Sequence, residues 1–228
     1  MNNRLLSCAE LVTGRARAVD VGTDHAHLAC HLVEQEICAG VTACDINEGP
    51  LAVARESVRI HGFEDKITII RTDGLNGIDG ADVSDVIIAG MGGELIAKIL
   101  DRCVWVKNAE VNLVLQPMSR ISLLRRWLYA NGFVIKDERT STDGKFVYTA
   151  MRACFSGRKK QLDAFTAYCG KLDFSNTSDR AFLKRQADKL FAAAEGMQKS
   201  VRKTREAREI MLTAEKIYNR LSVAGKSE

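Results

Sequence analysis

The sequence contains no apolar run that approaches the roughly 20 residues of a transmembrane helix, so we expect no membrane partner. The start of the chain does not form a signal peptide, because its short apolar stretch is interrupted by Glu10. A cytoplasmic protein is therefore expected. Internal repeats and low-complexity segments are also missing, and 228 residues suffice for one substantial core with a smaller appendage.

The cysteines lack the spacing of a metal site. No two of them form a C-x-x-C pair, and cysteine and histidine do not cluster as they do in zinc sites. Most stand beside apolar residues, which favours small buried thiols. We therefore expect no bound metal. The seven cysteines are Cys8, Cys30, Cys38, Cys44, Cys103, Cys154 and Cys169.

The net charge of +4 is unevenly distributed along the chain. Residues 1–156 hold 17 Lys and Arg against 20 Asp and Glu, whereas residues 157–228 hold 16 against 9. A mildly acidic body thus carries a basic C-terminal region. Such asymmetry indicates either a polyanionic partner or a solvated helical surface, and charge alone does not decide between them.

Strand-like and helix-like patterns alternate over the first 155 residues. This alternation predicts right-handed βαβ units around a parallel sheet. Asp143-Gly144 joins two further strand patterns and is a strong hairpin signal, so we expect one antiparallel edge strand. A mostly parallel seven-stranded sheet with a terminal hairpin is typical of Rossmann-like class I methyltransferases. The predicted strands span residues 16–21, 40–45, 66–71, 84–90, 111–117 (ending at Pro117), 133–142 and 145–155, and the predicted helices span residues 4–12, 25–35, 50–61, 94–102 and 121–132.

Beyond Gly157 the pattern is helical only. Apolar residues recur at spacings of three and four residues from Leu183 to Met197 and again from Ala207 to Leu221, as in packed helices. These stretches form either an antiparallel pair with a turn at Gly196 and the residues near Ser200, or one long helix. A first helix is expected from Lys159 to Cys169. We therefore predict a sheet domain over residues 1–156 and a small, coiled-coil-like helical domain over residues 157–228.

Glycines and acidic or amide side chains follow each of the first five strands. Ligands of open α/β sheets bind outside the carboxyl ends of the strands, where the strand order reverses. Taken singly, Asp45 is also explained as a helix N-cap, Asp73 as a turn residue and Gly90 as a tight turn. Their joint placement on one rim favours a ligand site. The strand-end residues are Asp20, Gly22, Asp24 and His25; Asp45, Ile46 and Asn47; Asp73, Gly74 and Leu75; Gly90, Met91 and Gly92; and Gln116.

The loop after the first strand distinguishes two adenosine cofactors. Asp45, at the end of the second strand, can accept both ribose hydroxyls of either NAD or S-adenosylmethionine. A dinucleotide also needs G-x-G-x-x-G, so that the backbone can approach its pyrophosphate. Here Asp24 stands at the second glycine position, and its carboxylate would repel a pyrophosphate. Asp20 or Asp24 suits the ammonium group of S-adenosylmethionine, which we predict as the cofactor.

Six segments carry a resemblance to a known family. They are VDVGTDHAHL, ACDINEGPLAVAR, RTDGLNGI, VIIAGMGGELI, LVLQPM and WLYANGFVI. Together they resemble the bacterial tRNA (adenine-22-N1)-methyltransferases of the TrmK family. The resemblance covers the whole predicted sheet domain, and it implies a class I fold, S-adenosylmethionine as methyl donor and tRNA as partner.

The resemblance also implies roles for the strand-end residues. Two departures concern fine binding detail: His27 stands where a tyrosine is expected, and Cys30-His31 replaces a more apolar, proline-containing stretch. By position, the resemblance assigns Gly22, Asp24 and His25 to the methionine end of the cofactor, Asp45, Ile46 and Asn47 to its ribose, Asp73, Gly74 and Leu75 to its adenine, and Gly90, Met91 and Gly92 to the floor beneath the sulfonium.

The predicted reaction is methyl transfer to N1 of adenine 22 in tRNA. N1 of neutral adenine has a free lone pair, so catalysis would rest on alignment and desolvation. The chain lacks the Asn/Asp-Pro-Pro-Tyr tetrapeptide of amino-group methyltransferases, which fits attack by a ring nitrogen. Asp24 is the candidate proton acceptor, and Gln116 is the candidate hydrogen-bond partner of the target base.

The basic tail is predicted to contact RNA phosphates. The predicted phosphate contacts are Lys184, Arg185, Lys189, Lys199, Arg202, Lys203, Arg205 and Arg208, with Arg120, Arg125 and Arg126 extending this surface toward the site.

The chain is expected to act as a monomer, although its apolar stripes could also pair between chains. Alternative functions are a methyltransferase acting on another RNA, a protein or a small molecule, and a non-catalytic RNA-binding protein with this fold. A nicotinamide dehydrogenase is a further alternative, which Asp24 disfavours.

Overall fold

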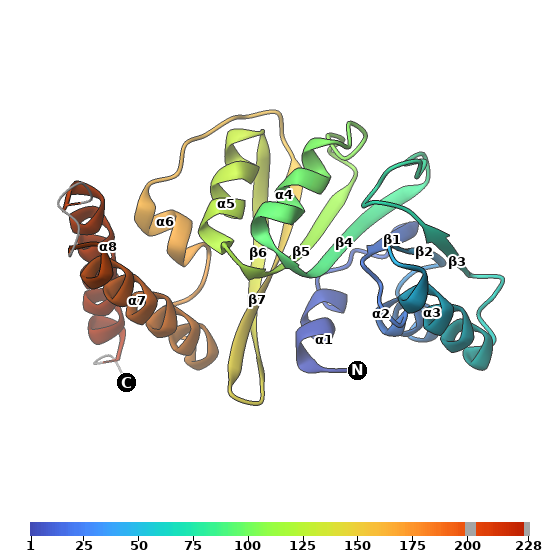
Figure 1. Ribbon diagram of the computed structural model, residues 1–228, viewed down its shortest axis with the longest axis horizontal. Helices are drawn as coiled ribbons and strands as arrows, with labels where there is room; N and C mark the ends of the chain where they lie inside the picture. Colours follow the sequence, from blue (N-terminus) through green and yellow to red (C-terminus); the bar gives the residue numbers. More distant parts are fainter. Residues whose placement is uncertain (199–203, 226–228) are drawn as a thin grey trace.

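Seven strands form one sheet in the order β3-β2-β1-β4-β5-β7-β6 in the computed structural model, which describes residues 1–198 and 204–225 (Figure 1). The pairs that join β3, β2, β1, β4 and β5 are all parallel, as the alternating sequence pattern predicts. The chain order reverses between β1 and β4, and ligands of such sheets bind outside the carboxyl ends of the strands at this point. The strands are β1 (Arg17–Val21), β2 (Gly40–Asp45), β3 (Ile67–Arg71), β4 (Val83–Gly92), β5 (Asn112–Ser119), β6 (Phe133–Asp143) and β7 (Phe146–Phe155).

The terminal hairpin is present, but its antiparallel strand does not lie at the edge. β7 pairs antiparallel with both β5 and β6, so β6 is the edge strand and the expected edge position was wrong. Burial explains the order. In β7, Thr149, Ala150 and Met151 are buried in succession, as suits a strand flanked on both sides, whereas exposed polar residues recur along β6.

The strand β5 was predicted to stop at Pro117, but it continues to Ser119. Proline cannot donate to a sheet ladder and is found at edges and irregularities. Here the register between β4 and β5 shifts on both sides of the pair Met91–Pro117, so the missing N–H of Pro117 coincides with a local irregularity. This irregularity lies on the rim where the strand-end residues gather.

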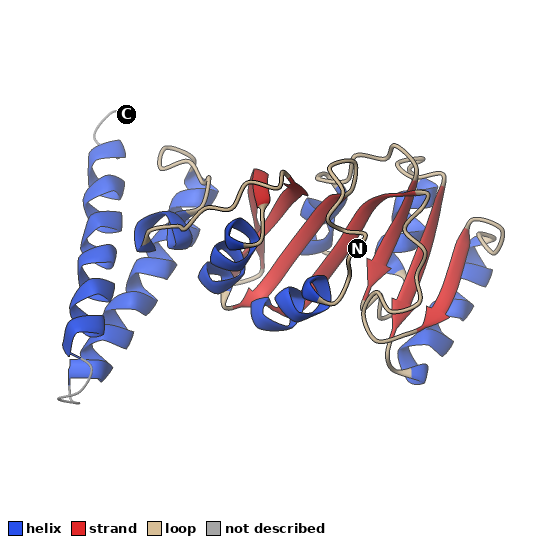
Figure 2. Ribbon diagram, turned by 90° about the horizontal axis from the view of Figure 1, so that it is seen from above, coloured by secondary structure: helices blue, strands red, loops and turns tan. Residues whose placement is uncertain are grey.

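Helices cover both faces of the sheet (Figure 2). One apolar cluster joins buried residues of the N-terminal helices α1, α2 and α3 to the sheet, and a second joins those of α4 and α5 to the opposite face. The apolar side chains of the strands are thereby covered from both sides, which accounts for the near-continuous apolar runs in the sequence. These helices are α1 (Asn3–Ala9), α2 (His27–Glu34), α3 (Glu48–His61), α4 (Gly93–Asp101) and α5 (Ile121–Ala130).

The C-terminal region consists of α6 (Ala164–Cys169), α7 (Thr177–Gln198) and α8 (Thr204–Ala224). The last two are separate antiparallel helices, since hydrogen bonds join Arg180 to Leu221 and Asp188 to Tyr218. Gly196 lies inside α7, so the turn does not begin there as predicted, and Ser200 lies outside the described residues.

The helix predicted from Lys159 is shorter and begins at Ala164, where the Asp163 carboxylate caps it by accepting from the Thr166 backbone N–H. The apolar stripes of the helical pair belong to the same core cluster as α4 and α5, so the pair is docked on the body at the β6 edge. The division at residue 156 stays a prediction.

Most of the cysteines are buried thiols. All seven are free, and all but Cys154 are buried, as predicted. Burial raises the pKa of the Cys8 and Cys44 thiols to about 12, so they stay protonated and unreactive. Within residues 1–198 and 204–225, no group of His, Cys, Asp or Glu is arranged to hold a metal ion, and no helix is long and apolar enough to cross a membrane.

Candidate cofactor and acceptor site

The loop that follows β1 is held in a conformation rare for L-amino acids. Gly22, Asp24 and Ala26 have φ angles of 72°, 54° and 58°. Only glycine adopts such angles without steric cost, and residues held there against their preference cluster at functional sites. The backbone N–H groups of Gly22 and Thr23 both donate to the carbonyl of Cys44, which fixes the loop against the end of β2.

Asp20 is a buried carboxylate beneath this loop. Its side chain accepts a hydrogen bond of 2.7 Å from the Thr23 hydroxyl, and the residue is 3% exposed. Burial raises its pKa to about 6, while the hydrogen bond from Thr23 opposes the shift and the nearby carboxylate of Asp45 adds to it. Asp20 is therefore a poorly solvated anion at neutral pH, and a bound cation would stabilise it.

Asp24 and His25 lie at the surface of the same loop. The Asp24 carboxylate is 3.4 Å from Nε2 of His25; the Asp24 side chain is largely exposed, and the His25 side chain is about half exposed. The positive φ of Asp24 turns the chain outward at the position where a dinucleotide-binding loop needs glycine. Two carboxylates thus lie at the carboxyl end of β1: Asp20 is buried beneath the loop, and Asp24 is exposed on the loop.

Asp45 ends β2 and shapes the turn into α3. One of its carboxylate oxygens accepts from the backbone N–H of Asn47 at 2.9 Å. The helix N-cap is Asn47 rather than Asp45, so the capping explanation of Asp45 does not apply. The second carboxylate oxygen of Asp45 has no hydrogen-bond partner among the described residues, which leaves an acceptor for hydroxyl groups. Ile46 beside it is exposed.

The segment after β3 combines a surface carboxylate with a buried leucine. Asp73 forms an ion pair with Arg102, with an oxygen–nitrogen distance of 2.8 Å, and both side chains are half exposed. No local sequence pattern indicated Arg102 as the partner that fixes this carboxylate on the rim. Gly74 has a φ of 65°, and a Cβ there would lie 3.0 Å from the side chain of Ile99. The side chain of Leu75 is buried in the core, so only its backbone faces the rim.

The turn after β4 is bound to β5 by one side-chain amide. Gln116 has no exposed surface, and its Oε1 accepts from the backbone N–H of Gly90 at 3.1 Å and from Nη1 of Arg4 at 2.8 Å. The amide nitrogen faces the Pro117 carbonyl at 3.3 Å. With both ends of the amide occupied, the geometry favours a role in holding the Gly90 turn over the predicted contact with a target base.

Close approaches explain the glycines of this rim. A Cβ on Gly22 would lie 2.3 Å from Cε of Met91, so the Met91 side chain covers the loop after β1 directly. A Cβ on Gly93 would lie 2.6 Å from the backbone carbonyl oxygen of Arg120, and one on Gly92 would lie 3.3 Å from the Ser119 hydroxyl. The strand-end residues predicted from the sequence therefore share one rim, with Leu75 contributing backbone only.

Comparison with known proteins decides the family. A family model described as a methyltransferase domain matches residues 1–151. A tRNA (adenine(22)-N(1))-methyltransferase of Bacillus subtilis is 30% identical to this chain over 193 residues, which cover 83% of this chain and 81% of that protein. The chain belongs to this methyltransferase family.

Solved structures resemble the methyltransferase over nearly its whole length. A Streptococcus agalactiae protein of the NADB-Rossmann superfamily superimposes with a TM-score of 0.84 at 29% identity, covering 95% of this chain and 96% of that one. Streptococcus pneumoniae Sp1610, solved in complex with S-adenosyl-L-methionine, superimposes with a TM-score of 0.78 at 30% identity, covering 94% and 97%. The likeness includes the helical C-terminal region, so this region is part of the shared fold.

One cation predicted to contact RNA is instead buried inside the methyltransferase. Arg125 and Glu138 have no exposed side-chain surface, and Nε of Arg125 lies 2.8 Å from a Glu138 oxygen. Nη1 of the same guanidinium donates to the carbonyls of Ala167 and Tyr168 in α6. Arg125 thus joins α6 to the sheet, and its predicted place on an RNA-binding surface was wrong. Reasoning from the sequence missed this role, because the partners of Arg125 are distant along the chain.

The other predicted cations divide into three groups. Arg126 donates to the Leu162 carbonyl, and Arg120 is exposed beside Glu94 at 3.8 Å. Arg185 donates to the Lys145 carbonyl at the tip of the β6–β7 hairpin. Of the cations predicted on the helical pair, Lys184, Arg185, Lys189, Arg205 and Arg208 are exposed, and Lys199, Arg202 and Lys203 lie outside the described residues.

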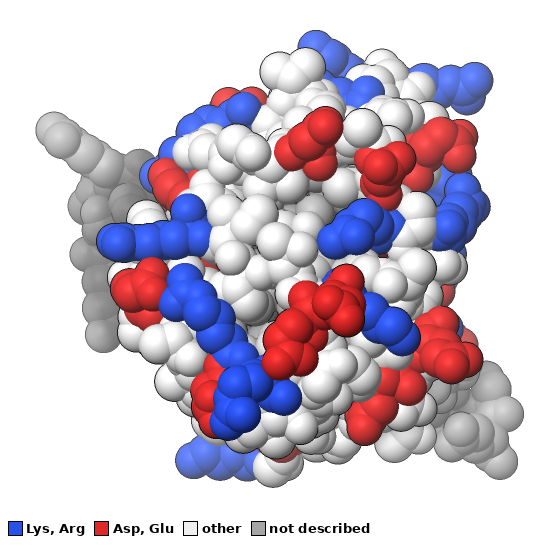
Figure 3. All heavy atoms as spheres, turned by 90° about the vertical axis from the view of Figure 1, so that its right-hand side faces the viewer, with Lys and Arg blue, Asp and Glu red and all other residues white. Residues whose placement is uncertain are grey.

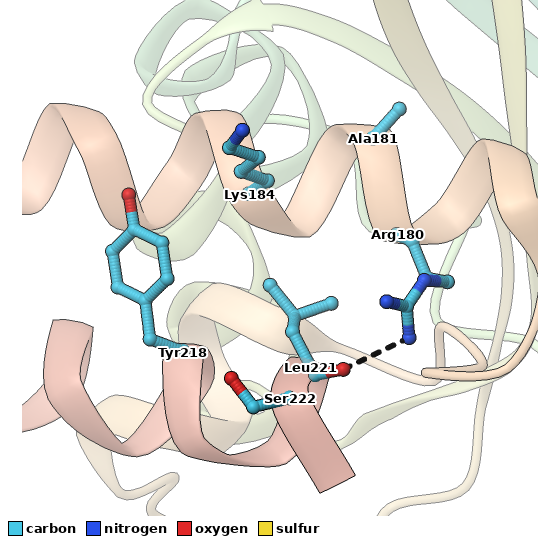
Figure 4. A pocket seen from close by; sticks show the side chains of 6 residues that line it. All are labelled: Arg180, Ala181, Lys184, Tyr218, Leu221 and Ser222. Atoms are coloured by element: carbon cyan, nitrogen blue, oxygen red, sulfur yellow. Dashed lines mark hydrogen bonds between the residues drawn. The ribbon is translucent and has the colours of Figure 1, made fainter. Parts of the chain in front are cut away.

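A shallow pocket of about 270 Å³ lies between α7 and α8. Figure 4 shows Arg180 and Lys184 on one wall and Tyr218 and Ser222 on the other, with Arg180 donating to the Leu221 carbonyl. No carboxylate lines this pocket. In contrast, Lys and Arg alternate with Asp and Glu over the β3 end of the molecule (Figure 3), so that face offers no patch of one sign.

Proposed function

We propose that this methyltransferase transfers a methyl group from S-adenosylmethionine to N1 of adenine 22 in tRNA. The observation that carries the proposal is the 30% identity, over 83% of the chain, with the Bacillus subtilis enzyme of that specificity. The tRNA substrate also makes a cytoplasmic location the expected one.

The rim fits S-adenosylmethionine better than a dinucleotide. Asp24 stands where a dinucleotide-binding loop needs glycine to admit the pyrophosphate, and Asp20 and Asp24 both suit an ammonium group. The free oxygen of Asp45 suits ribose hydroxyls, and the Asp73–Gly74 turn suits an adenine edge. The remaining residues proposed to bind the cofactor are Gly22, His25, Ile46, Asn47, Leu75, Gly90, Met91 and Gly92.

Bound S-adenosylmethionine supplies the electrophilic methyl group, and the chain supplies alignment. N1 of adenine carries its own lone pair, so no residue has to remove a proton before attack. Gly90 is exposed and has no side chain, so it leaves room for a base next to the cofactor. Good alignment lowers a barrier by up to roughly 7–11 kcal/mol. Asp24 stays the proposed proton acceptor after transfer, and Gln116 is proposed to position the turn.

We infer that the tRNA phosphates contact the exposed cations of α7 and α8. Deleting residues 157–228 would not test this, because their apolar side chains form part of the common core. The better test replaces Lys184 and Lys189 by Gln and compares this variant with Lys66→Gln, whose exposed side chain lies at the β3 end. Each lost phosphate contact should lower the slope of log affinity against log salt concentration by about one. An unchanged slope would exclude these two contacts.

A monomer is the proposed state, because the apolar stripes of α7 and α8 are buried against each other within one chain. Sedimentation at micromolar concentration tests this, and a dimer would contradict it.

The decisive experiment measures transfer of a labelled methyl group to an unmodified tRNA transcript and to the same transcript with guanine at position 22. We expect labelling of the first substrate only. Labelling of both, or mapping of the methyl group to another atom, would refute the proposed acceptor. Absence of any S-adenosylmethionine binding by calorimetry would refute the cofactor as well.

A further inference from the structure

Arg4, which no sequence pattern singled out, reaches the acceptor side of the rim from the N-terminal helix. Its Nη1 donates to Gln116 Oε1 across 112 residues of sequence. The same nitrogen lies 3.4 Å from the point where a Gly90 Cβ would be, and Nη2 lies 3.8 Å from it. Gly90 is exposed, so the guanidinium borders the open side of the turn.

The helix that carries Arg4 is fixed in place at both of its sides. The Asn2 side chain caps α1 by accepting from the Leu5 backbone N–H. Asn3 donates to the Thr142 carbonyl at 2.9 Å, and the hydroxyls of Ser7 and Ser141 are 3.3 Å apart, which ties α1 to the end of β6. Arg4 is therefore presented from a rigid element rather than from a mobile terminus.

Only part of the guanidinium is used within the protein. Among residues 1–198 and 204–225, Nη1 donates to Gln116, whereas Nε and Nη2 have no acceptor and Arg4 pairs with no carboxylate. Neither nitrogen is a buried atom without a partner, so both reach solvent. A partly buried cation with two free donors suits an anion of fork-like geometry.

We propose that Arg4 binds a backbone phosphate of the acceptor strand beside the target adenosine and thereby positions the base over the Gly90 turn. This inference rests on the proposed function. A phosphate is the favoured partner because methylation at N1 gives the adenine a positive charge, which an adjacent guanidinium would oppose. Through Nη1 the same side chain holds Gln116, so phosphate binding and the shape of the turn are coupled.

The test compares Arg4→Gln with Arg4→Lys and with Arg15→Gln. Arg15 is an exposed arginine that lies before β1, at the opposite end of that strand from the rim, and its removal changes the net charge equally. For Arg4→Gln we expect the KM for tRNA to rise roughly tenfold, the value of one charge-assisted hydrogen bond. The affinity for S-adenosylmethionine should stay within about twofold, and the salt slope of kcat/KM should fall by about one. Arg4→Lys should restore the salt slope but only part of the loss in KM, because it keeps the charge and lacks the fork of two donors.

Three results would overturn the inference. One is a KM for tRNA that matches the Arg15→Gln control. Another is a fall in affinity for S-adenosylmethionine as large as the rise in the KM for tRNA. This result would show that Arg4 only holds the turn in shape. A third is an Arg4→Lys variant that is as impaired as Arg4→Gln while the salt slope of kcat/KM stays unchanged in both variants. If the unaltered enzyme transfers no methyl group to tRNA, the proposed function itself fails, and the Arg4 assignment fails with it.

Discussion

Replacing Glu138 by Gln should destabilise the protein severely, because the substitution leaves a buried guanidinium without its counter-charge. Neither Glu138 nor Arg125 has exposed side-chain surface. Glu138 also accepts from the backbone N–H of Lys171, and a Gln side chain cannot accept at both positions. Nη2 of Arg125 is already buried without a hydrogen-bond partner, so no spare acceptor is available to it. Removing one partner of a buried ion pair costs roughly 3–5 kcal/mol.

Thermal unfolding followed by circular dichroism measures this effect. For a chain of this size, 1 kcal/mol shifts Tm by about 2–4 °C, so the expected fall is roughly 6–20 °C. The control is Glu110→Gln, since Glu110 pairs with Arg15 at an exposed site, and such pairs contribute about 0–1 kcal/mol. The double variant Arg125→Met/Glu138→Leu should recover much of the loss, because apolar replacements of buried pairs are often neutral. A Glu138→Gln variant that unfolds within 1 kcal/mol of the unaltered protein would refute this reasoning.

Two further predictions concern the rim. Because the pKa of Asp20 is raised to about 6 when folded, its contribution to stability is full below pH 3.8 and is lost as pH rises through 6, by at most about 3 kcal/mol. Urea titrations between pH 4 and 7.5 should show this fall in the free energy of unfolding, and an Asp20→Asn variant that shows the same fall would contradict it. Gly93→Ala should lose about 2 kcal/mol or more, because its Cβ would meet a backbone oxygen at 2.6 Å, whereas Gly49→Ala, which meets nothing within 4 Å, should gain about 0.5–1 kcal/mol in helix α3. Equal effects of the two alanines would exclude the steric explanation.

Features encoded locally were predictable from the sequence. The ends of β1 and β2 follow from apolar runs that stop at glycine or acidic residues, and β3 ends at Arg71 as predicted, whereas β4 continues to Gly92, two residues beyond its predicted end. The Asp143–Gly144 turn is likewise a two-residue signal. The order of the two hairpin strands could not be predicted in this way, because it depends on which of them has a neighbouring strand on both of its sides.

Long-range polar contacts were the features that sequence reasoning missed. Arg125 stands in a helix rich in cations, and nothing local shows that Glu138 and two carbonyls of α6 surround it. Arg4 and Gln116 are 112 residues apart, and neither lies in a motif that names the other. Such contacts are decided by burial, since an unpaired polar group in the core is costly, and burial is known only once the chain is folded.

These two contacts bear on how a large substrate is aligned. Arg125 fixes α6, and with it the helical pair, to the sheet, while Arg4 fixes the N-terminal helix to the turn at which the base is proposed to enter. If the helical pair binds the body of the tRNA, the distance from there to the rim is set by a rigid protein rather than by a hinge. The proposed reaction needs no general base before attack, so such an enzyme gains most from rigid alignment. A displacement of the acceptor by about 1 Å costs a large part of the rate. It follows that substitutions at Arg125 or Glu138 that leave the protein folded should lower kcat/KM for tRNA well before they weaken the binding of S-adenosylmethionine.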